Sequence, residues 1–247
     1  MSIVLDSGEI SAPMAMCLDQ QLLDTLDSGG ELQMHFYNWD SPTLTYGYFF
    51  PISEYVNRGA WEAAGGKLAR RPTGGGIMFH WQDFAFSILV PRRYPLCQQP
   101  LAFRYRMMQE TIRNALVAVF PDVQAIVCVE GALVAAPFCM LKPTTCDLIL
   151  AGQKIAGAAQ RLTKQGMLYQ VSILIQPAPA DHVKECGLDE DLSFHMYKKK
   201  ILSKALHNPS WANVLLQESS HPLTMSLEQR RELKAQICAQ LVHALLF

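Results

Sequence analysis

The chain lacks the features of a membrane, secreted or nucleic-acid-binding protein. Its apolar runs are short and interrupted by charge, so no membrane-spanning helix is expected. The first 20 residues have neither a basic start nor a cleavable apolar core, and we therefore expect a cytoplasmic protein without a signal peptide. A formal net charge of -1 provides no basic footprint for nucleic acid. The sequence thus predicts neither a membrane nor a nucleic-acid partner.

Cysteine occurs seven times, but the chain has no C-x-x-C pair and no regular cysteine spacing. An odd number of cysteines without such spacing indicates reduced thiols rather than a disulfide scaffold. Cys139 and Cys146 have no closely spaced histidines that would complete a zinc-binding set. The sequence therefore predicts no metal site.

The chain does contain three consecutive glycines shortly after two arginines, in K-L-A-R-R-P-T-G-G-G-I-M-F-H from Lys67 to His80. Glycines let a ligand approach the main chain closely, and the forked donors of Arg70 and Arg71 suit phosphate or carboxylate oxygens. The segment matches neither G-x-G-x-x-G nor a Walker loop ending in G-K-[ST]. It therefore indicates either an anion-binding turn or a tight hairpin with solvated arginines.

A second glycine-bearing segment, G-Q-K-I-A-G-A-A-Q from Gly152 to Gln160, follows the apolar run Asp147 to Leu150. Small residues let two backbones, or a backbone and a ligand, come close together. Lys154 is therefore a candidate charge in a tight cleft. Taken alone, a lysine in this position is more often a solvated turn residue, because lysine is mostly exposed.

Together, the two segments resemble the paired signatures of the lipoate-protein ligase and octanoyltransferase family, which shares its fold with the biotin-protein ligases. The stretch M-A-M-C-L-D-Q-Q-L-L, Met14 to Leu23, resembles the opening helix of that family, and His35 to Phe49 resembles the two-strand element before the glycine turn. The resemblance covers about residues 14–175 in collinear order. It implies an α/β (α+β) domain whose mixed, largely antiparallel sheet is flanked by helices.

The hydrophobic patterns favour the same class of fold, because strands and helices alternate irregularly along the chain. Helices are expected at 12–26 and 101–119, the second with Arg104 on its solvent face, and Ser226 with Gln229 resembles a capping box before a terminal helix. Strands are expected at residues 32–39, 43–50, 76–79, 84–90, 125–130, 147–150 and 168–175. We expect one domain over residues 1–247, with the motifs at about 14–175 and a helical part at about 190–247.

The resemblance implies that the chain attaches an octanoyl or lipoyl group to one lysine of a lipoyl domain of 2-oxoacid dehydrogenase complexes or of the glycine-cleavage H protein. In the transferase route, a cysteine takes octanoyl from the thioester of acyl carrier protein and no cofactor is needed. In the ligase route, ATP and magnesium activate free lipoate as an adenylate and no protein nucleophile is needed. The resemblance assigns a catalytic charge to Lys154. It assigns acyl and adenylate binding to Arg70, Arg71, Thr73, Gly74, Gly75, Gly76, His80, Asp147, Gly157 and Ala158.

Cys139 discriminates between the two routes. It lies fifteen positions before Lys154, and a cysteine at that offset resembles the catalytic cysteine of the octanoyltransferases. A nearby lysine would favour the thiolate and stabilise the tetrahedral oxyanion. The alternative is a buried cysteine that packs as a small hydrophobe. His80 is likewise either a residue that orients the acyl site or a hydrogen-bonded histidine at a strand end.

Several positions depart from the family patterns. The chain reads C-D-L at Cys146, where the ligases typically carry asparagine, although Asp147 is retained as in the ligases. Phe50 replaces a glutamine that is usual in the transferases, and Trp81 replaces a common aspartate whose role Asp83 could take in part. We favour octanoyl transfer through Cys139. The alternatives are an ATP-dependent lipoate ligase and a catalytically impaired binder of lipoyl domains.

Overall fold

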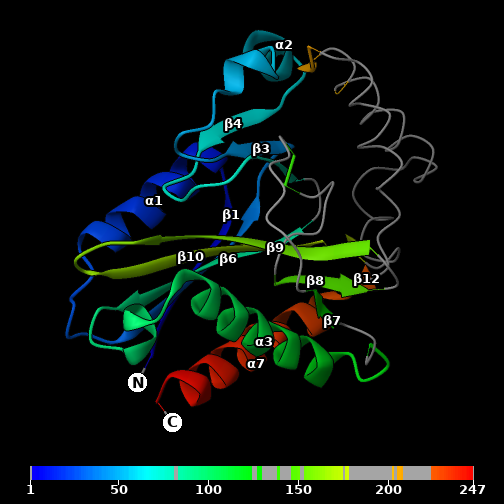
Figure 1. The fold of residues 1–247 in the computed structure, drawn as a ribbon. Coiled ribbons are helices and arrows are strands. Elements are labelled where there is room, and N and C mark those ends of the chain that lie inside the picture. Colours follow the sequence, from blue (N-terminus) through cyan, green and yellow to red (C-terminus); the bar gives the residue numbers. More distant parts are fainter. Residues whose placement is uncertain are drawn as a thin grey trace.

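A seven-stranded sheet runs through the protein, and a smaller sheet faces it (Figure 1). The computed structural model describes residues 2–80, 83–123, 127–129, 138–139, 146–150, 153–174, 176–177, 202, 205–207 and 224–246. The large sheet contains, in spatial order, β1 (Ser2–Ile10), β2 (Leu32–Trp39), β6 (Asp83–Pro91), β10 (Gly166–Leu174), β9 (Gln153–Leu162), β8 (Asp147–Leu150) and β7 (Val127–Val129). The smaller sheet contains β4 (Lys67–Arg70), β3 (Thr43–Tyr46) and β5 (Ile77–His80), and the short strands β11 (Gln176–Pro177) and β12 (Thr224–Met225) pair separately.

Most neighbouring strands of the large sheet run antiparallel to each other. Every neighbouring pair in it is antiparallel except β1 with β2, which are parallel. In the smaller sheet, β3 pairs with β4 in parallel and with β5 antiparallel. The predicted mixed, largely antiparallel sheet is confirmed.

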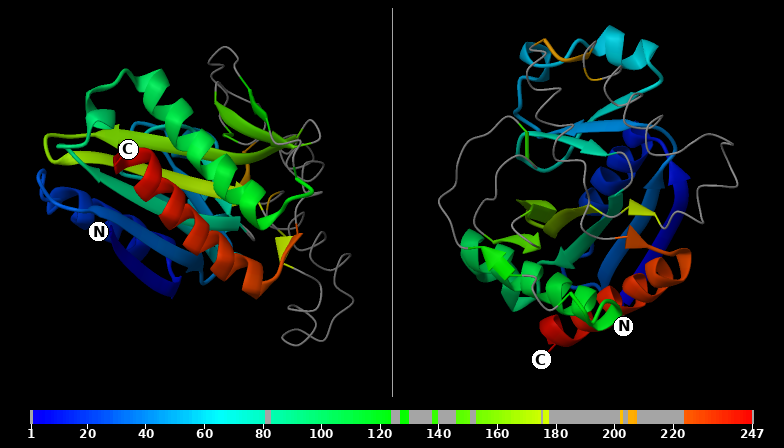
Figure 2. Two further views of the ribbon diagram at one scale, coloured as in Figure 1. Left: turned by 90° about the horizontal axis from the view of Figure 1, so that it is seen from below. Right: turned by 90° about the vertical axis from the view of Figure 1, so that its right-hand side faces the viewer.

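Helices cover the large sheet on one face, and the smaller sheet faces it from the other side (Figure 2). The helices α3 (Leu101–Val119) and α7 (Leu227–Leu246) lie side by side on the first face. The helix α1 (Ala12–Asp24) lies on the opposite face, where it contacts both the large sheet and β4. The short helix α2 (Arg58–Ala63) packs on β4 at the outer side of the smaller sheet, and 3-10 turns occupy Ile52–Glu54 and Pro95–Gln98.

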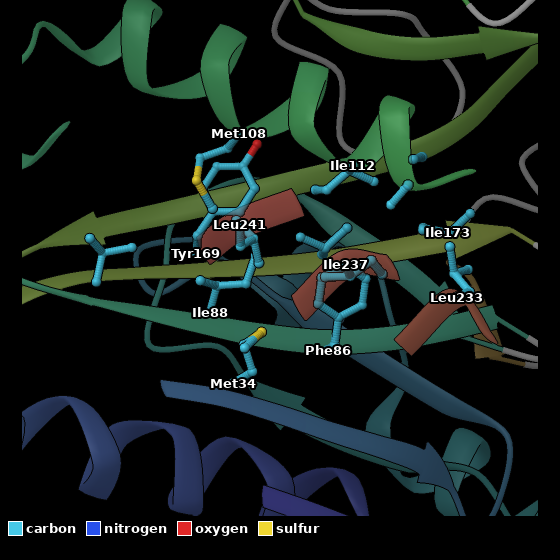
Figure 3. Close-up of a cluster of buried hydrophobic side chains, with 14 of the residues drawn as sticks. Met34, Phe86, Ile88, Met108, Ile112, Tyr169, Ile173, Leu233, Ile237 and Leu241 are labelled. Atoms are coloured by element: carbon cyan, nitrogen blue, oxygen red, sulfur yellow. The ribbon is translucent and has the colours of Figure 1, made fainter. Parts of the chain in front are cut away.

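The largest apolar core lies between the large sheet and the helix pair α3 and α7 (Figure 3). Met108 and Ile112 of α3 meet Ile237 and Leu241 of α7 there, and Tyr169 of β10 packs against them. All five side chains are fully buried. Burying each aliphatic side chain of this kind contributes roughly 1.5–3 kcal/mol to folding. This packing fixes α7 against the face of the sheet opposite the smaller sheet.

The predicted terminal helix begins with the expected capping box. The backbone N–H of Gln229 donates to Ser226 Oγ at 3.2 Å, and the side-chain oxygen Oε1 of Gln229 accepts from the backbone N–H of Ser226 at 2.9 Å. The two hydrogen bonds satisfy backbone donors that the first helical turn leaves free. The predicted bounds of β2, β8 and α3 agree with the structure, whereas α1 ends two residues earlier than predicted.

The prediction for Arg104 is wrong. This residue was expected on the solvent face of α3, but only 8% of it is exposed. Its guanidinium donates to Gln160 Oε1 at 2.7 Å and to the Gln99 carbonyl oxygen at 2.5 Å, because β9 lies directly beside the start of α3. A long cationic side chain can be buried when its head is hydrogen-bonded in this way.

Most of residues 190–223, where a helical part was expected, lie outside the described residues. Within the part of the chain that the structure describes, no helix combines the length and the apolar character needed to cross a bilayer.

Candidate active site

A cavity of about 630 Å³ lies between the two sheets. Tyr37 of β2 and Met78 of β5 contribute to its apolar wall, together with Tyr105 from α3. Phe138, which forms an isolated parallel bridge with Ile77, contributes a further ring. A mostly apolar cavity of this size with a few polar groups is typical of a small-ligand site.

Most of the predicted site residues line this cavity. They are Arg71, Gly75, Gly76, His80, Cys139, Asp147, Lys154, Gly157 and Ala158, and Phe50 and Cys146 lie there as well. Three others lie outside it. Arg70 is exposed, with its guanidinium 4.5 Å from the centre of the Tyr48 ring, and Gly74 also lies outside the lining. Thr73 is buried behind the turn, where its hydroxyl donates to Gln170 Oε1 at 2.6 Å.

Arg71 holds the glycine turn together from inside. Its Nη2 donates to the carbonyl oxygens of Gly74 at 3.1 Å and Gly76 at 2.9 Å. Gly75 has a φ of +97°, a conformation that favours glycine. A Cβ at Gly47 would stand only 2.0 Å from the Gly75 carbonyl oxygen, so the turn also needs glycine in the strand end beneath it. The hydrogen bonds from Arg71 and the backbone angle of Gly75 thus define the shape of the turn.

Backbone hydrogen bonds fix the position of Cys139. Its amide donates to the Ile77 carbonyl oxygen at 2.8 Å, which ties it to β5. Its own carbonyl oxygen accepts from Lys154 Nζ at 2.7 Å. The same ammonium pairs with Asp147 Oδ2 at 2.6 Å, and both side chains are almost completely buried. Lys154 therefore links β8, β9 and the backbone of Cys139.

Arg71 is a charged neighbour of the Cys139 thiol. A Cβ placed on Gly75 would lie 3.1 Å from Arg71 Nη2 and 3.7 Å from Cys139 Sγ, so the two groups share one small space. Burial lowers the pKa of Arg71, whereas the charge of Cys139 and a hydrogen bond with its side chain act to raise it. Lys154, the charged neighbour expected from the sequence, also lies next to Cys139, at its carbonyl oxygen.

His80 has partners on both ring nitrogens. Its Nδ1 lies 2.6 Å from Asp83 Oδ2, and its Nε2 lies 2.7 Å from Thr45 Oγ1. Burial alone would raise the pKa of Asp83, but the charge and hydrogen bond of His80 and the Ser172 hydroxyl hold it below its usual value. Asp83 thus pairs with His80, while Trp81 lies outside the described residues.

Two further polar residues line the cavity without belonging to either sequence motif. Thr45 carries no motif signal, since a threonine in a strand is usually a neutral β-former. Gln170 is a polar residue within the apolar strand β10, and its side-chain amide donates to Asp19 Oδ2 at 2.7 Å. A polar residue inside an otherwise apolar strand is the one available sequence signal. Within the described residues, no group of three or more His, Cys, Asp or Glu side chains is arranged to hold a metal ion.

Cys146 occupies a strained backbone conformation with φ at 70°. Asparagine tolerates this region better than most residues, and a β-branched residue tolerates it worst. We expect Cys146→Asn to raise the free energy of unfolding by about 1 kcal/mol and Cys146→Val to lower it by about 1–2 kcal/mol. Urea unfolding of the two variants and the unchanged protein measures both. A valine variant more stable than the asparagine variant would contradict the expectation.

Comparison with protein families gives one match that covers most of the chain. Residues 11–195 match the family described as the lipoyl protein ligase A/B catalytic domain. The chain is also 31% identical over 204 residues to an octanoyltransferase LipM of Anoxybacillus flavithermus, an alignment that spans 78% of this chain and 68% of that protein.

Comparison with solved structures finds the same fold. A lipoate-protein ligase A bound with ATP superposes with a TM-score of 0.68 at 21% identity, over 99% of this chain and 85% of that chain. A bi-partite archaeal lipoate protein ligase from Thermoplasma acidophilum, described together with its E2 lipoyl domain, gives a TM-score of 0.60 at 20% identity, over 100% and 85%. At these identities, the likeness concerns the fold, and it agrees with the predicted ligase-type catalytic domain.

Proposed function

Because the chain belongs to the lipoyl protein ligase A/B catalytic domain family, we propose that it transfers octanoyl from acyl carrier protein to a lipoyl-domain lysine through a thioester on Cys139. The observation that carries this proposal is the position of Cys139, at the cavity and beside the guanidinium of Arg71. Members of this family act in protein lipoylation, and the chain is an enzyme of that kind. The nucleophile and the acyl donor are the parts that require testing.

The transfer consists of two substitutions at one carbonyl carbon. First, the Cys139 thiolate attacks the donor thioester, the bond from the carbonyl carbon to the donor sulfur breaks, and the departing thiolate takes up a proton. Second, the neutral amine of the acceptor lysine attacks the Cys139 thioester, the carbon–sulfur bond breaks and an amide forms. The amine then loses a proton and the Cys139 thiolate is restored. No oxidation and no nucleotide is involved.

The site provides each step with a specific group. The apolar wall of the cavity suits an eight-carbon chain, since it buries hydrocarbon that would otherwise contact water. Arg71 lies beside the sulfur of Cys139, which carries a negative charge as a thiolate. Cationic donors in a buried site stabilise such a charge strongly. Lys154 keeps Cys139 in place through its carbonyl oxygen. The acceptor is a lipoyl domain of a 2-oxoacid dehydrogenase complex or an H protein.

The second candidate is an ATP-dependent lipoate ligase. The buried pair of Asp147 and Lys154 beside the glycine turn favours it, because family resemblance assigns Lys154 to an adenylate in such enzymes. In that case, free lipoate, ATP and magnesium would replace the acyl carrier protein, and Cys139 would have no covalent role. The overall fold is compatible with both routes.

Intact mass spectrometry distinguishes the candidates. The purified protein is incubated with an apo lipoyl domain and octanoyl-acyl carrier protein without ATP, and in parallel with lipoate, ATP and magnesium. We expect a hydroxylamine-sensitive octanoyl adduct on the protein and an octanoyl mass on the lipoyl domain in the first reaction. Modification in the second reaction alone would establish a ligase. Binding of the lipoyl domain without modification in either reaction would leave the impaired-binder alternative.

A further inference from the structure

One row of paired residues across the large sheet forms the floor of the cavity. It consists, in spatial order, of Gly157 on β9, Ser172 on β10, Ala85 on β6 and Tyr37 on β2, and all four line the cavity. Residues that stand opposite each other in neighbouring strands point to the same face of a sheet. The next residues along β2 and β6 point to the other face, where Phe36 and Phe86 belong to the helix-covered core. The row therefore faces the smaller sheet and crosses the large sheet from β9 to β2.

The side chains of this row are small until the row reaches β2. Gly157 has no side chain beyond a hydrogen, and those of Ser172 and Ala85 are short. Tyr37 closes the row with a buried ring, and Met16 of α1 packs in the same apolar cluster as Ala85 and Tyr37. Met16 also lines the cavity. The floor is thus a groove over three strands that ends at Tyr37 and Met16.

The polar side chains beside the row are bonded to one another. On one side, the Gln170 amide donates to Asp19 Oδ2 at 2.7 Å. On the other side, Asp83 accepts from Trp39 Nε1 at 3.0 Å and from the Ser172 hydroxyl. Buried polar groups that are paired in this way do not require a polar ligand. The groove therefore suits a hydrocarbon chain.

The row has the length of an eight-carbon chain. Neighbouring strands lie about 4.8 Å apart, so β6 lies about 10 Å and β2 about 14 Å from β9 along the row. The seven carbon–carbon bonds of an octanoyl group, each about 1.5 Å long, span about 9 Å when the chain is extended. The nucleophile stands at the β9 end, because Lys154 of β9 donates to the Cys139 carbonyl oxygen. An octanoyl chain on Cys139 would therefore place its last carbons over Ala85, in front of Tyr37.

We propose that Ala85 sets the length of the acyl chain that this enzyme accepts, and that Tyr37 and Met16 form the stop at the end of the groove. The inference rests on the proposed function, because it names the acyl groups that the same cavity selects. The small side chain of Ala85 leaves room for the last carbons of an octanoyl group. A longer chain would collide with Tyr37 and Met16, and a shorter chain would leave apolar surface of the groove uncovered.

Two variants of Ala85 test this assignment. Ala85→Val adds two carbons in the groove, whereas Ala85→Ser adds a single oxygen. Each protein is incubated without ATP with an apo lipoyl domain and an equimolar mixture of hexanoyl-, octanoyl- and decanoyl-acyl carrier protein, and the lipoyl domain is analysed by intact mass spectrometry. We expect the valine variant to lower the ratio of octanoyl to hexanoyl product by about tenfold, because the added carbons occupy the space of the last methylenes. The serine variant should keep the ratio of the unchanged protein.

Met16→Ala tests the stop from the opposite direction. It should open the end of the groove and raise the ratio of decanoyl to octanoyl product by about tenfold. Met34→Ala is the matched control, since Met34 is also buried but lies in the core on the other face of the sheet, outside the cavity lining (Figure 3). Both variants lose stability through a cavity, but only Met16→Ala should change the ratio. Because all donors compete in one reaction, the ratio does not depend on the fraction of folded enzyme.

Folded Ala85→Val and Met16→Ala proteins with the product ratios of the unchanged protein would overturn the proposal. The same selection is measured without catalysis by calorimetric titration with hexanoate, octanoate and decanoate. There, Ala85→Val should weaken the binding of octanoate relative to hexanoate by about tenfold. If this shift occurs but the unchanged protein forms no octanoyl product from acyl carrier protein, the role of Ala85 stands and the proposed function is overturned.

Discussion

Replacing Cys139 with alanine is expected to abolish the acyl-enzyme and to slow ATP-independent octanoyl transfer by roughly a thousandfold or more, because no other step can replace the covalent one. The fold should remain intact. The contacts that hold this position are made by its backbone amide to Ile77 and by its carbonyl oxygen to Lys154, and alanine keeps both. The melting temperature should therefore change little, since the residue is only half-buried.

Cys17 supplies the control for this variant. It is an exposed thiol on α1, outside the cavity lining, so Cys17→Ala should transfer octanoyl at the unchanged rate. Transfer rates are measured by the appearance of octanoyl-lipoyl domain in intact mass spectra. If Cys139→Ala still transfers octanoyl without ATP, Cys146 becomes the next thiol to test, because it lines the same cavity.

Replacing Lys154 with methionine is expected to lower the free energy of unfolding by about 3–5 kcal/mol and to reduce octanoyl transfer strongly. Removing one partner of a buried ion pair leaves the other charge in a poorly solvated site, here the carboxylate of Asp147. The change also removes the donor to the Cys139 carbonyl oxygen, so the nucleophile loses one of its two backbone anchors. Urea unfolding and transfer assays measure the two effects separately.

A double variant distinguishes the effect on stability from the effect on catalysis. Lys154→Met with Asp147→Asn removes both charges, and it should recover much of the lost stability because no isolated ion remains. Transfer should stay impaired, since the anchor of Cys139 is still missing. Full recovery of transfer in the double variant would show that Lys154 acts only through stability.

The local patterns of the sequence predicted much of the fold and many of the residues at the site. Alternating and apolar runs gave the bounds of β2 and β8. Leu233, Ile237 and Leu241 of α7 stand four residues apart and are fully buried, as a helix with one apolar face requires. The capping box at Ser226 was also readable from sequence, because its hydrogen bonds span only three residues. The strands β4 and β9 were missed, and so was the edge strand β1. Ile3 and Val4 there are both about half exposed, so the strand lacks the alternation that marks a half-buried strand.

The roles of two adjacent arginines show where sequence reasoning ends. Successive residues of an extended chain point to opposite sides. Arg70 therefore lies over the exposed Tyr48 ring, whereas Arg71 enters the protein beneath the glycine turn. The pattern R-R does not indicate which of the two arginine side chains faces the cavity. That choice depends on how β4 is laid beside β3, which is a property of the tertiary structure.

By itself, the sequence determined the chemical parts of this protein: a glycine turn, a cysteine and a lysine at a fixed offset, within a largely antiparallel α/β fold. These features are local, so the spacing of nearby residues in the sequence is enough to indicate them. Only the tertiary structure decided that Arg71 lies beside the Cys139 thiol, and that Thr45, His80 and Asp83 stand behind it. Those contacts join strands from both sheets, and burial makes them strong because water does not compete for the hydrogen bonds.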